Sequence, residues 1–343
     1  MSIVELMVAI TIGLIILAAV STVFVSSKSN YTTQESSARL QESARFAMNF
    51  ISQDLRMAGY FGCADDLQTI HNNLNPGGIS PAFDFSIPIE GSEAGTTVFY
   101  PSGSATKFPT TGAAATSQAA NCPGFVGGRC TGTDAFALRR ADPASISLTT
   151  AMPNTSAALF IEPNNGLQIG DIILLSDCAG AELFQITNIQ NNVGPNSDKQ
   201  GVVHNTGGGS PSPGNAQKFE RAYGPPGAKI MKFVQRAYYI GTGTNGQPTL
   251  FRQNLDGTNL QELVEGIEDM QVTFGYGSYG DKTPRVYLPA NDGSLGATKA
   301  NWSNVVSARI EITARPVLDT SPNNPNKVQP KTFVSTIFMR NLK

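Results

Sequence analysis

Ionisable side chains are scarce in this chain. Only 15% of its 343 residues are Asp, Glu, Lys or Arg, only two are histidine, and the formal net charge is −2. The sequence therefore has no basic stripe of the kind that binds nucleic acid, and we expect no nucleic-acid partner. With His71 and His204 as the only histidines, no Ser/His/Asp or Cys/His set can be assembled, so we do not expect an enzyme.

Cysteine is also sparse, and its spacing argues against the common metal sites. The four cysteines form no Cys-x-x-Cys pair, and neither histidine lies near two of them, so we expect no zinc and no c-type haem. An even cysteine count favours disulfide bonds, and four cysteines allow three pairings. The Gly-rich segment between Cys122 and Cys130 can close a short loop. We predict that these two pair, which leaves Cys63 with Cys178.

Glycine-rich strings do not indicate a cofactor here. Two segments of the form Gly-x-Gly-x-x-Gly begin at Gly241 and Gly275. A dinucleotide fingerprint needs a helix directly after the glycines, whose N-terminus holds the pyrophosphate. Strand-like sequence follows the first string and a proline-containing turn follows the second. We interpret both as turns and expect no cofactor.

The chain does contain a long apolar run at its beginning. From Leu6 to Val25 there are twenty residues without a charge, enough for a helix of about 30 Å, the thickness of a bilayer core. No Lys or Arg precedes the run, and it is longer than the core of a signal peptide, which favours a retained helix. Glu5 lies at the edge of the run, where a buried, unpaired carboxylate would cost several kcal/mol. We expect it to have a partner, and the nearest candidate is an α-amino group at the chain start. A plain membrane anchor remains the alternative.

Helical periodicity continues beyond the apolar run. Residues 26–58 contain neither Gly nor Pro, and apolar or small residues recur there every three or four positions. The pattern predicts one helix from about residue 2 to residue 58, ended by Gly59. Gly13 has the lowest helix propensity in the apolar half and is the place where the helix would bend or melt. We expect three parts: 1–28 as the apolar half of the helix, 29–58 as its amphipathic half, and 59–343 as a globular α+β body.

The last third of the chain predicts an antiparallel sheet. Apolar residues at 306, 308, 310, 312 and 314 alternate with polar ones, which indicates a strand with one buried face. Further strands are expected at 229–240, 249–252, 270–276 and 333–339, and shorter ones at 170–175 and 183–186. No helical crossover separates them, so the expected fold class is α+β, with the long helix packed on an antiparallel sheet.

The first residues resemble the start of a mature type IV pilin. The string from Ser2 to Ile10, SIVELMVAI, joins Glu5 to a full-length apolar helix. The resemblance implies that prepilin peptidase cuts just before Met1, that Met1 becomes the N-terminus and is often N-methylated, and that Glu5 pairs with the Met1 amine of a neighbouring subunit. It also implies a protein held in the bacterial inner membrane before assembly and then found in an extracellular pilus with other pilin subunits as partners.

Four further segments are similar to patterns of the PilW-type minor pilins: 56–63, 170–178, 261–271 and 338–341. This resemblance implies a minor subunit that helps to start filament assembly. A principal filament subunit is an alternative, and a membrane-anchored extracellular binding protein is an alternative of another class.

Overall fold

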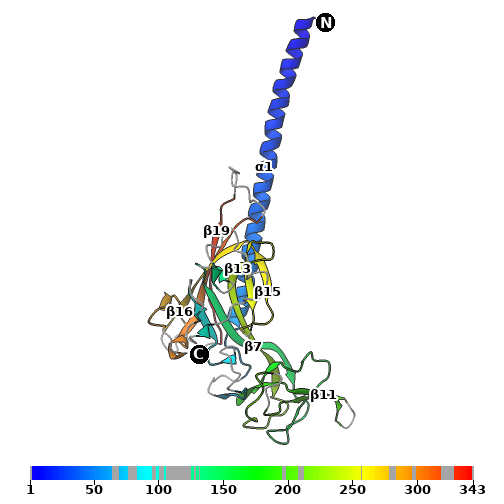
Figure 1. Ribbon diagram of the computed structural model, residues 1–343, viewed down its shortest axis with the longest axis vertical. Coiled ribbons are helices and arrows are strands. Elements are labelled where there is room, and N and C mark those ends of the chain that lie inside the picture. Colours follow the sequence, from blue (N-terminus) through cyan, green and yellow to red (C-terminus); the bar gives the residue numbers. More distant parts are fainter. Residues whose placement is uncertain are drawn as a thin grey trace.

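The structure is a computed structural model. It describes residues 2–63, 69–75, 83–94, 98–99, 104–105, 125–126, 129–130, 132–194, 198–207, 212–255, 257–277, 283–295, 299–317 and 328–341. Within these residues it contains one long helix and several antiparallel sheets, which agrees with the expected α+β class (Figure 1).

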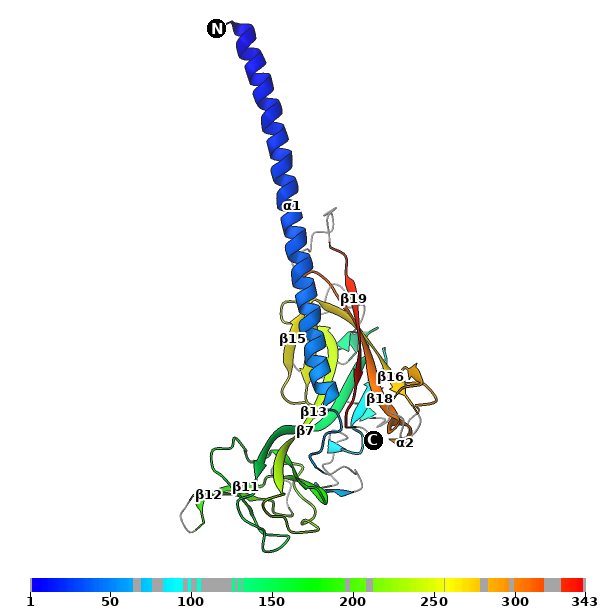
Figure 2. The same ribbon diagram turned by 180° about the vertical axis from the view of Figure 1, so that it is seen from behind.

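The long helix is α1 (Ile3–Arg56), 54 residues without a break. Ser2 caps its beginning, and the backbone turns away at Gly59, whose φ of 74° lies in the left-handed region where glycine is favoured. The expected bounds of 2 and 58 were right to within two residues. The N-terminal half projects alone from one end of the molecule, whereas the C-terminal half lies along the body (Figures 1 and 2).

An eight-stranded sheet, counted over the described residues, forms the centre of the body. Its path is β1-β10-β9-β13-β14-β15, with β7 paired to β13 and β2 paired to β7. The strands are β1 (Ile70–Asn72), β2 (Ile89–Ser92), β7 (Ala135–Ser147), β9 (Ile172–Asp177), β10 (Gly180–Gln185), β13 (Lys229–Thr242), β14 (Pro248–Gln253) and β15 (Gln261–Glu265). The pair of β1 and β10 is parallel, which corrects the expectation of a purely antiparallel arrangement.

Strands β7 and β13 form a long ribbon that joins two parts of the body. One edge of β13 pairs with β7 from Lys229 to Tyr238. The other edge pairs first with β9 and then, from Ala237 onward, with β14. The ribbon thus runs from the part beside α1 into a distal lobe, which lies at the end of the molecule farthest from the N-terminus (Figure 2).

A four-stranded sheet completes the part beside α1, in the order β17-β16-β18-β19. Its strands are β16 (Ile267–Tyr276), β17 (Val286–Leu288), β18 (Val305–Ala314) and β19 (Lys331–Phe338), and the short helix α2 (Lys299–Trp302) precedes β18. The predicted alternation of β18 holds from Ala308 to Ala314. Val306 is only half-buried, however, and Val305 is buried instead. The register shifts near Tyr276, and a one-residue shift exchanges the faces of a strand.

The main core lies between α1 and the two sheets. The buried stripe of α1, which includes Leu40, Ala47 and Ile51, packs into one cluster with Phe274 of β16 and Ile310 of β18. A second cluster fills the junction around β9, β10 and the start of β13. A third fills the distal lobe, where a three-stranded sheet of β8 (Leu159–Ile161), β11 (Asn188–Val193) and β12 (Lys199–Val203) lies.

Two small two-stranded sheets are also described. They pair β3 (Val98–Phe99) with β4 (Ser104–Ala105), and β5 (Phe125–Val126) with β6 (Arg129–Cys130).

Candidate functional site: the N-terminal helix and its junction with the body

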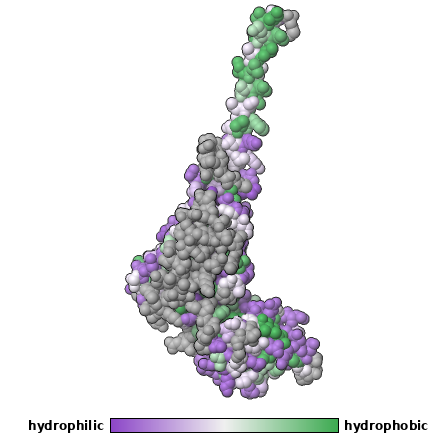
Figure 3. Space-filling view, in the orientation of Figure 1, coloured by the Kyte–Doolittle hydropathy of each residue, from purple (hydrophilic) through white to green (hydrophobic). Residues whose placement is uncertain are grey.

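The first half of α1 is an apolar surface that no described part of the chain covers. Every residue from Ile3 to Lys28 is exposed, including large aliphatic side chains such as Ile3 at 78% and Ile15 at 70%. In Figure 3 this half of the helix is mostly green, whereas the coloured surface of the body is largely purple and white. Among the described residues, it belongs to the one helix long and apolar enough to cross a membrane. So large an apolar area is stable only against lipid or protein.

Glu5 makes a local contact at the very start of this surface. Its carboxylate accepts a hydrogen bond of 2.9 Å from the Ser2 backbone N–H, while the Ser2 hydroxyl accepts one of 3.3 Å from the Val4 N–H. This reciprocal arrangement is a capping box, which satisfies two of the N–H groups left free at a helix start. Among the described residues, Glu5 forms no ion pair. Met1 lies outside the described residues, so pairing between Glu5 and the Met1 amine of a neighbour stays a prediction.

The helix is continuous through Gly13 in this single chain. Nothing lies within 4 Å of the place where a Cβ on Gly13 would be, so a larger side chain would meet no part of the same chain there. The expected loss of helix beyond Gly13 concerns the assembled state and stays a prediction.

A buried charge cluster fixes the other end of α1 to the body. Asp54, with a side chain 5% exposed, lies 3.0 Å from Arg140 of β7 and 2.7 Å from Arg236 of β13. It also accepts a hydrogen bond from the Tyr238 hydroxyl, and Arg252 of β14 lies 3.8 Å away. One carboxylate on the helix therefore binds groups from three strands.

The electrostatics of the cluster keep Asp54 ionised. Burial by itself would raise the pKa of Asp54, but the charge of Arg236, the hydrogen bonds from Tyr238 and Arg236, and the charge of Arg140 outweigh burial and hold this pKa below its ordinary value of 3.8. Burial and the neighbouring carboxylate of Asp54 raise the pKa of the Tyr238 hydroxyl, so it stays protonated and donates. The cluster therefore holds α1 in one position on the sheet through charged groups.

From the sequence alone, Asp54 is expected with Gln53 and Arg56 on the polar face of the helix, but it is buried. A signal for the correct place was present, because the spacing of Ala47, Ile51 and Ala58 puts residue 54 on the buried face. The charge of Asp54 hid this signal, since carboxylates are rarely buried unless paired, and the paired arginines are distant in sequence.

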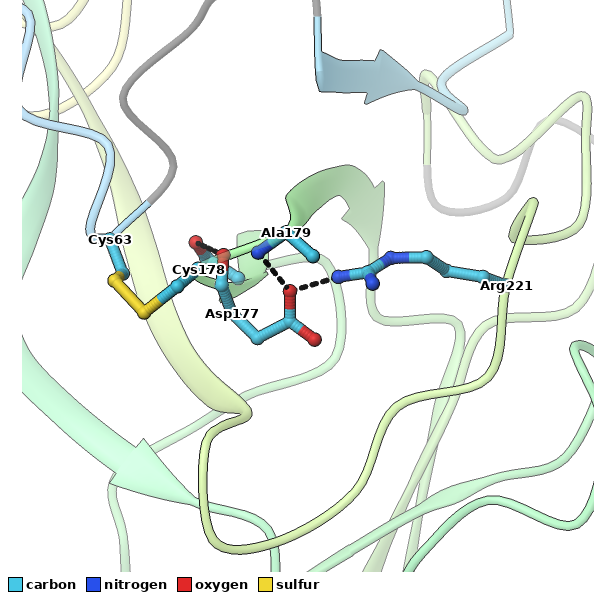
Figure 4. The surroundings of a disulfide bond; sticks show 6 residues. Cys63, Asp177, Cys178, Ala179 and Arg221 are labelled. Carbon is cyan, nitrogen blue, oxygen red and sulfur yellow. Dashed lines mark hydrogen bonds and ion pairs between the residues drawn. A yellow bond between two sulfur atoms is a disulfide. The ribbon is translucent and has the colours of Figure 1, made fainter.

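A disulfide bond ties the segment after α1 to the distal side of the body. It joins Cys63 to Cys178, which lies in the turn between β9 and β10 (Figure 4). Beside it, Asp177 accepts a 2.9 Å hydrogen bond from the Ala179 N–H and forms an ion pair with Arg221. This is one of the two disulfides that the sequence led us to expect.

The second expected disulfide cannot be placed in the same way. Cys130 is fully buried, but Cys122 lies outside the described residues. Pairing of Cys122 with Cys130 stays a prediction, which non-reducing peptide mapping would test.

No group of three or more His, Cys, Asp or Glu side chains is placed to hold a metal ion, as far as the described residues extend. The described residues thus give this region three features: an uncovered apolar helix, a single carboxylate near its tip, and a rigid connection to a folded body.

Comparison with known families gives one match. Residues 237–337 match the family described as type IV pilus-assembly protein W, PilW. These residues run from the end of β13 to β19, so they cover much of the part beside α1 and leave out α1 itself and the distal lobe. Of the four segments with PilW-like patterns, only 261–271 lies inside the match. No curated protein and no solved structure matches the chain.

Proposed function

We propose that this chain is a minor pilin, a structural subunit that helps to initiate assembly of a type IV pilus. The match over residues 237–337 relates the chain to proteins of type IV pilus assembly. The finer role rests on α1, because its first half, exposed over residues 3–28, needs an apolar environment that the described part of the chain does not provide.

Two environments would cover this surface in turn. Before assembly, the inner membrane would hold residues 6–25, whose length as a helix fits the hydrocarbon core. After assembly, neighbouring pilin subunits would replace the lipid, and the body would form the outer surface of the filament. Prepilin peptidase would generate the Met1 terminus before this transfer.

The charge of Glu5 would set the axial position of the helix as the subunit passes from the membrane to the filament. A carboxylate inside an apolar filament core costs several kcal/mol unless a cation and hydrogen bonds compensate it. The Met1 amine of a neighbouring subunit would supply that cation. Only one axial position of the incoming helix would satisfy both charges, so the pair would select the correct subunit spacing.

The Asp54 cluster supports the same role from the other end of the helix. Because Asp54 binds Arg140, Arg236 and Tyr238, the body is held in a fixed orientation on α1. The position of the helix in a filament would therefore set the position of the body on its surface.

Two alternatives make different predictions. A principal subunit would use the same helix but would be present in many copies along each filament. A membrane-anchored binding protein would use the helix only to stay in the membrane and would be absent from filaments. Counting copies per purified filament by quantitative mass spectrometry separates all three roles, and a few copies per filament is the result we expect.

Substitution of Glu5 tests the assembly role directly. Glu5→Gln keeps the capping box with Ser2, since glutamine accepts the same hydrogen bond, and removes only the charge. We expect the variant to stay in the membrane fraction and to enter filaments at a greatly reduced level. Glu5→Ala should behave in the same way.

The matched control is Glu42→Gln, which removes an exposed carboxylate from the amphipathic half of the same helix. This control should enter filaments normally. If Glu5→Gln is incorporated as well as Glu42→Gln, the charge of Glu5 has no role in assembly and the proposed pairing is refuted.

A further inference from the structure

The distal lobe contains a polar hollow that no part of the proposed assembly role uses. Its volume is about 910 Å³, near the upper end of the range of small-ligand sites. Three segments line it, residues 155–156, 204–206 and 216–220. They lie beside β12, at the end of the molecule opposite the apolar helix (Figures 1 and 2). The residues that match the PilW family do not include them.

Hydrogen bonds to neighbouring parts of the lobe hold the walls of the hollow in place. The His204 Nε2 lies 3.0 Å from the Ala157 carbonyl oxygen, which joins the first segment to the second. Thr206 forms a backbone β-bridge with Asn215, and the Glu220 N–H donates a hydrogen bond of 3.0 Å to the buried carboxylate of Glu182. The second and third segments are therefore fixed to the core of the lobe, and the hollow exists before any ligand enters.

An aromatic stack lies beneath the lining and is itself buried, with Phe219 2% and His204 5% exposed. The rings of His204 and Phe219 lie 3.9 Å apart between centroids and are nearly parallel, and Phe184 packs edge-on against both. Burial lowers the pKa of His204 below 6.5, so the ring is neutral at pH 7. The aromatic stack therefore carries no charge.

The rest of the lining consists of uncharged polar groups with free bonding capacity. In the part of the chain that the structure describes, the side chains of Thr206 and Gln217 are exposed and make no hydrogen bond, and the Ser156 hydroxyl makes none either. Hydroxyl and amide groups both donate and accept hydrogen bonds. One cation, Lys218, and one anion, Glu220, also line the hollow, so the lining has no net charge over the residues that the structure describes.

From this chemistry we infer that the hollow binds a neutral, hydroxyl-rich ligand, a short oligosaccharide. Sugar hydroxyls also donate and accept, so they match a wall of Ser, Thr and Gln side chains. An apolar ligand would leave the polar groups without water or partner, which is unfavourable. A multiply charged ligand would find no excess of opposite charge.

The inference does not depend on the filament role, because a protein held only in the membrane would present the same lobe outward. Its test needs the full chain, purified in a detergent without a sugar head group. Binding is measured on an array of neutral, sialylated and sulfated oligosaccharides, and dissociation constants of the ligands found there are then measured by isothermal titration calorimetry.

The test variant is Thr206→Ala/Gln217→Ala. Both side chains are exposed and neither makes an intramolecular hydrogen bond among the described residues, so the lobe should keep its fold. Gln168→Ala removes an exposed glutamine of the same lobe outside the hollow and serves as the matched control. We expect binding of at least one neutral oligosaccharide, weakened tenfold or more in the double variant and changed less than twofold in the control.

Three outcomes overturn the inference: no oligosaccharide on the array binds, only charged oligosaccharides bind, or the double variant binds as tightly as the natural chain. Filament incorporation of the double variant, measured as for Glu5→Gln, should be normal. The oligosaccharide inference and the assembly role can therefore fail separately.

Discussion

Removal of the Asp54 carboxylate is the sharpest test of how the body is held on α1. In Asp54→Ala, the Arg140 side chain, which is 9% exposed, loses its counter-ion. Arg236 is 23% exposed and can turn its charge toward water, so most of the cost falls on Arg140. Breaking a buried ion pair in this way costs about 3–5 kcal/mol, and the buried hydroxyl of Tyr238 also loses its acceptor.

The assay can use the single tryptophan of the chain. Trp302 is 4% exposed and packs against Phe274 in the core beside α1, so its fluorescence reports unfolding of this part of the body. For a body of this size, about 2 °C of melting temperature corresponds to 1 kcal/mol. We expect Asp54→Ala to lower the melting temperature of the full chain in detergent by about 6–10 °C.

Two comparisons show that the charge is responsible. Glu35→Ala removes an exposed ion pair with Arg39 from the same helix and should cost no more than about 0.5 kcal/mol. The double variant Asp54→Ala/Arg140→Met removes both the carboxylate and the charge it leaves buried, so it should regain part of the lost stability.

The pH dependence gives an independent check. The pKa of Asp54 is lower in the folded state than in the unfolded chain, so its contribution is complete above the unfolded value of about 3.8 and is lost as the pH falls through the folded value. The difference between the natural chain and Asp54→Ala should be constant from pH 8 to pH 5 and shrink in strong acid. A loss of less than about 1 kcal/mol at pH 7, or no recovery in the double variant, would refute the reasoning.

Three further predictions concern the disulfide, the apolar half of α1 and the distal lobe. Cys63→Ser/Cys178→Ser should lower the free energy of unfolding by about 2–5 kcal/mol in urea titrations, and an unchanged urea midpoint would count against a stabilising role for the bond. In a filament map, helical hydrogen bonds should be lost between Gly13 and about residue 19, whereas the isolated, membrane-embedded subunit should stay helical there; an unbroken helix in the filament would contradict this. An NMR titration should place the midpoint of the His204 ring below pH 6.5, and this group should reduce stability as the pH falls below about 6.5; a midpoint at or above 6.5 would show that burial does not control it.

The sequence predicted the elements whose side chains follow a simple period. The bounds of α1 came from a three- to four-residue spacing, and β18 came from alternation, because one of its faces lies in the main core. Agreement was closest where a single sheet face decides which residues are apolar.

Strand β7 was missed because its buried half does not look like a strand. Residues 135–141 are buried on both faces and include Arg139 and Arg140. Those charges are tolerated because Arg139 pairs with Glu90 and Arg140 with Asp54. These partners lie 49 and 86 positions away in the sequence, and no local pattern indicates a contact of that separation. The polar hollow was hidden for the same reason, since three separate segments form it.

The bond between Cys63 and Cys178 also decides how a pull on the molecule would travel. Long stretches of the chain separate the distal lobe from α1. Without the disulfide bond, a load on the lobe would therefore be carried by the hydrogen bonds of the β7–β13 ribbon. With the bond, covalent links run from the β9–β10 turn through Cys178 and Cys63 to Gly59 and the end of the helix, a path of only a few residues. Tension between the lobe and the helix is then carried by this covalent path, and the hydrogen bonds of the ribbon and the noncovalent core carry less of the force.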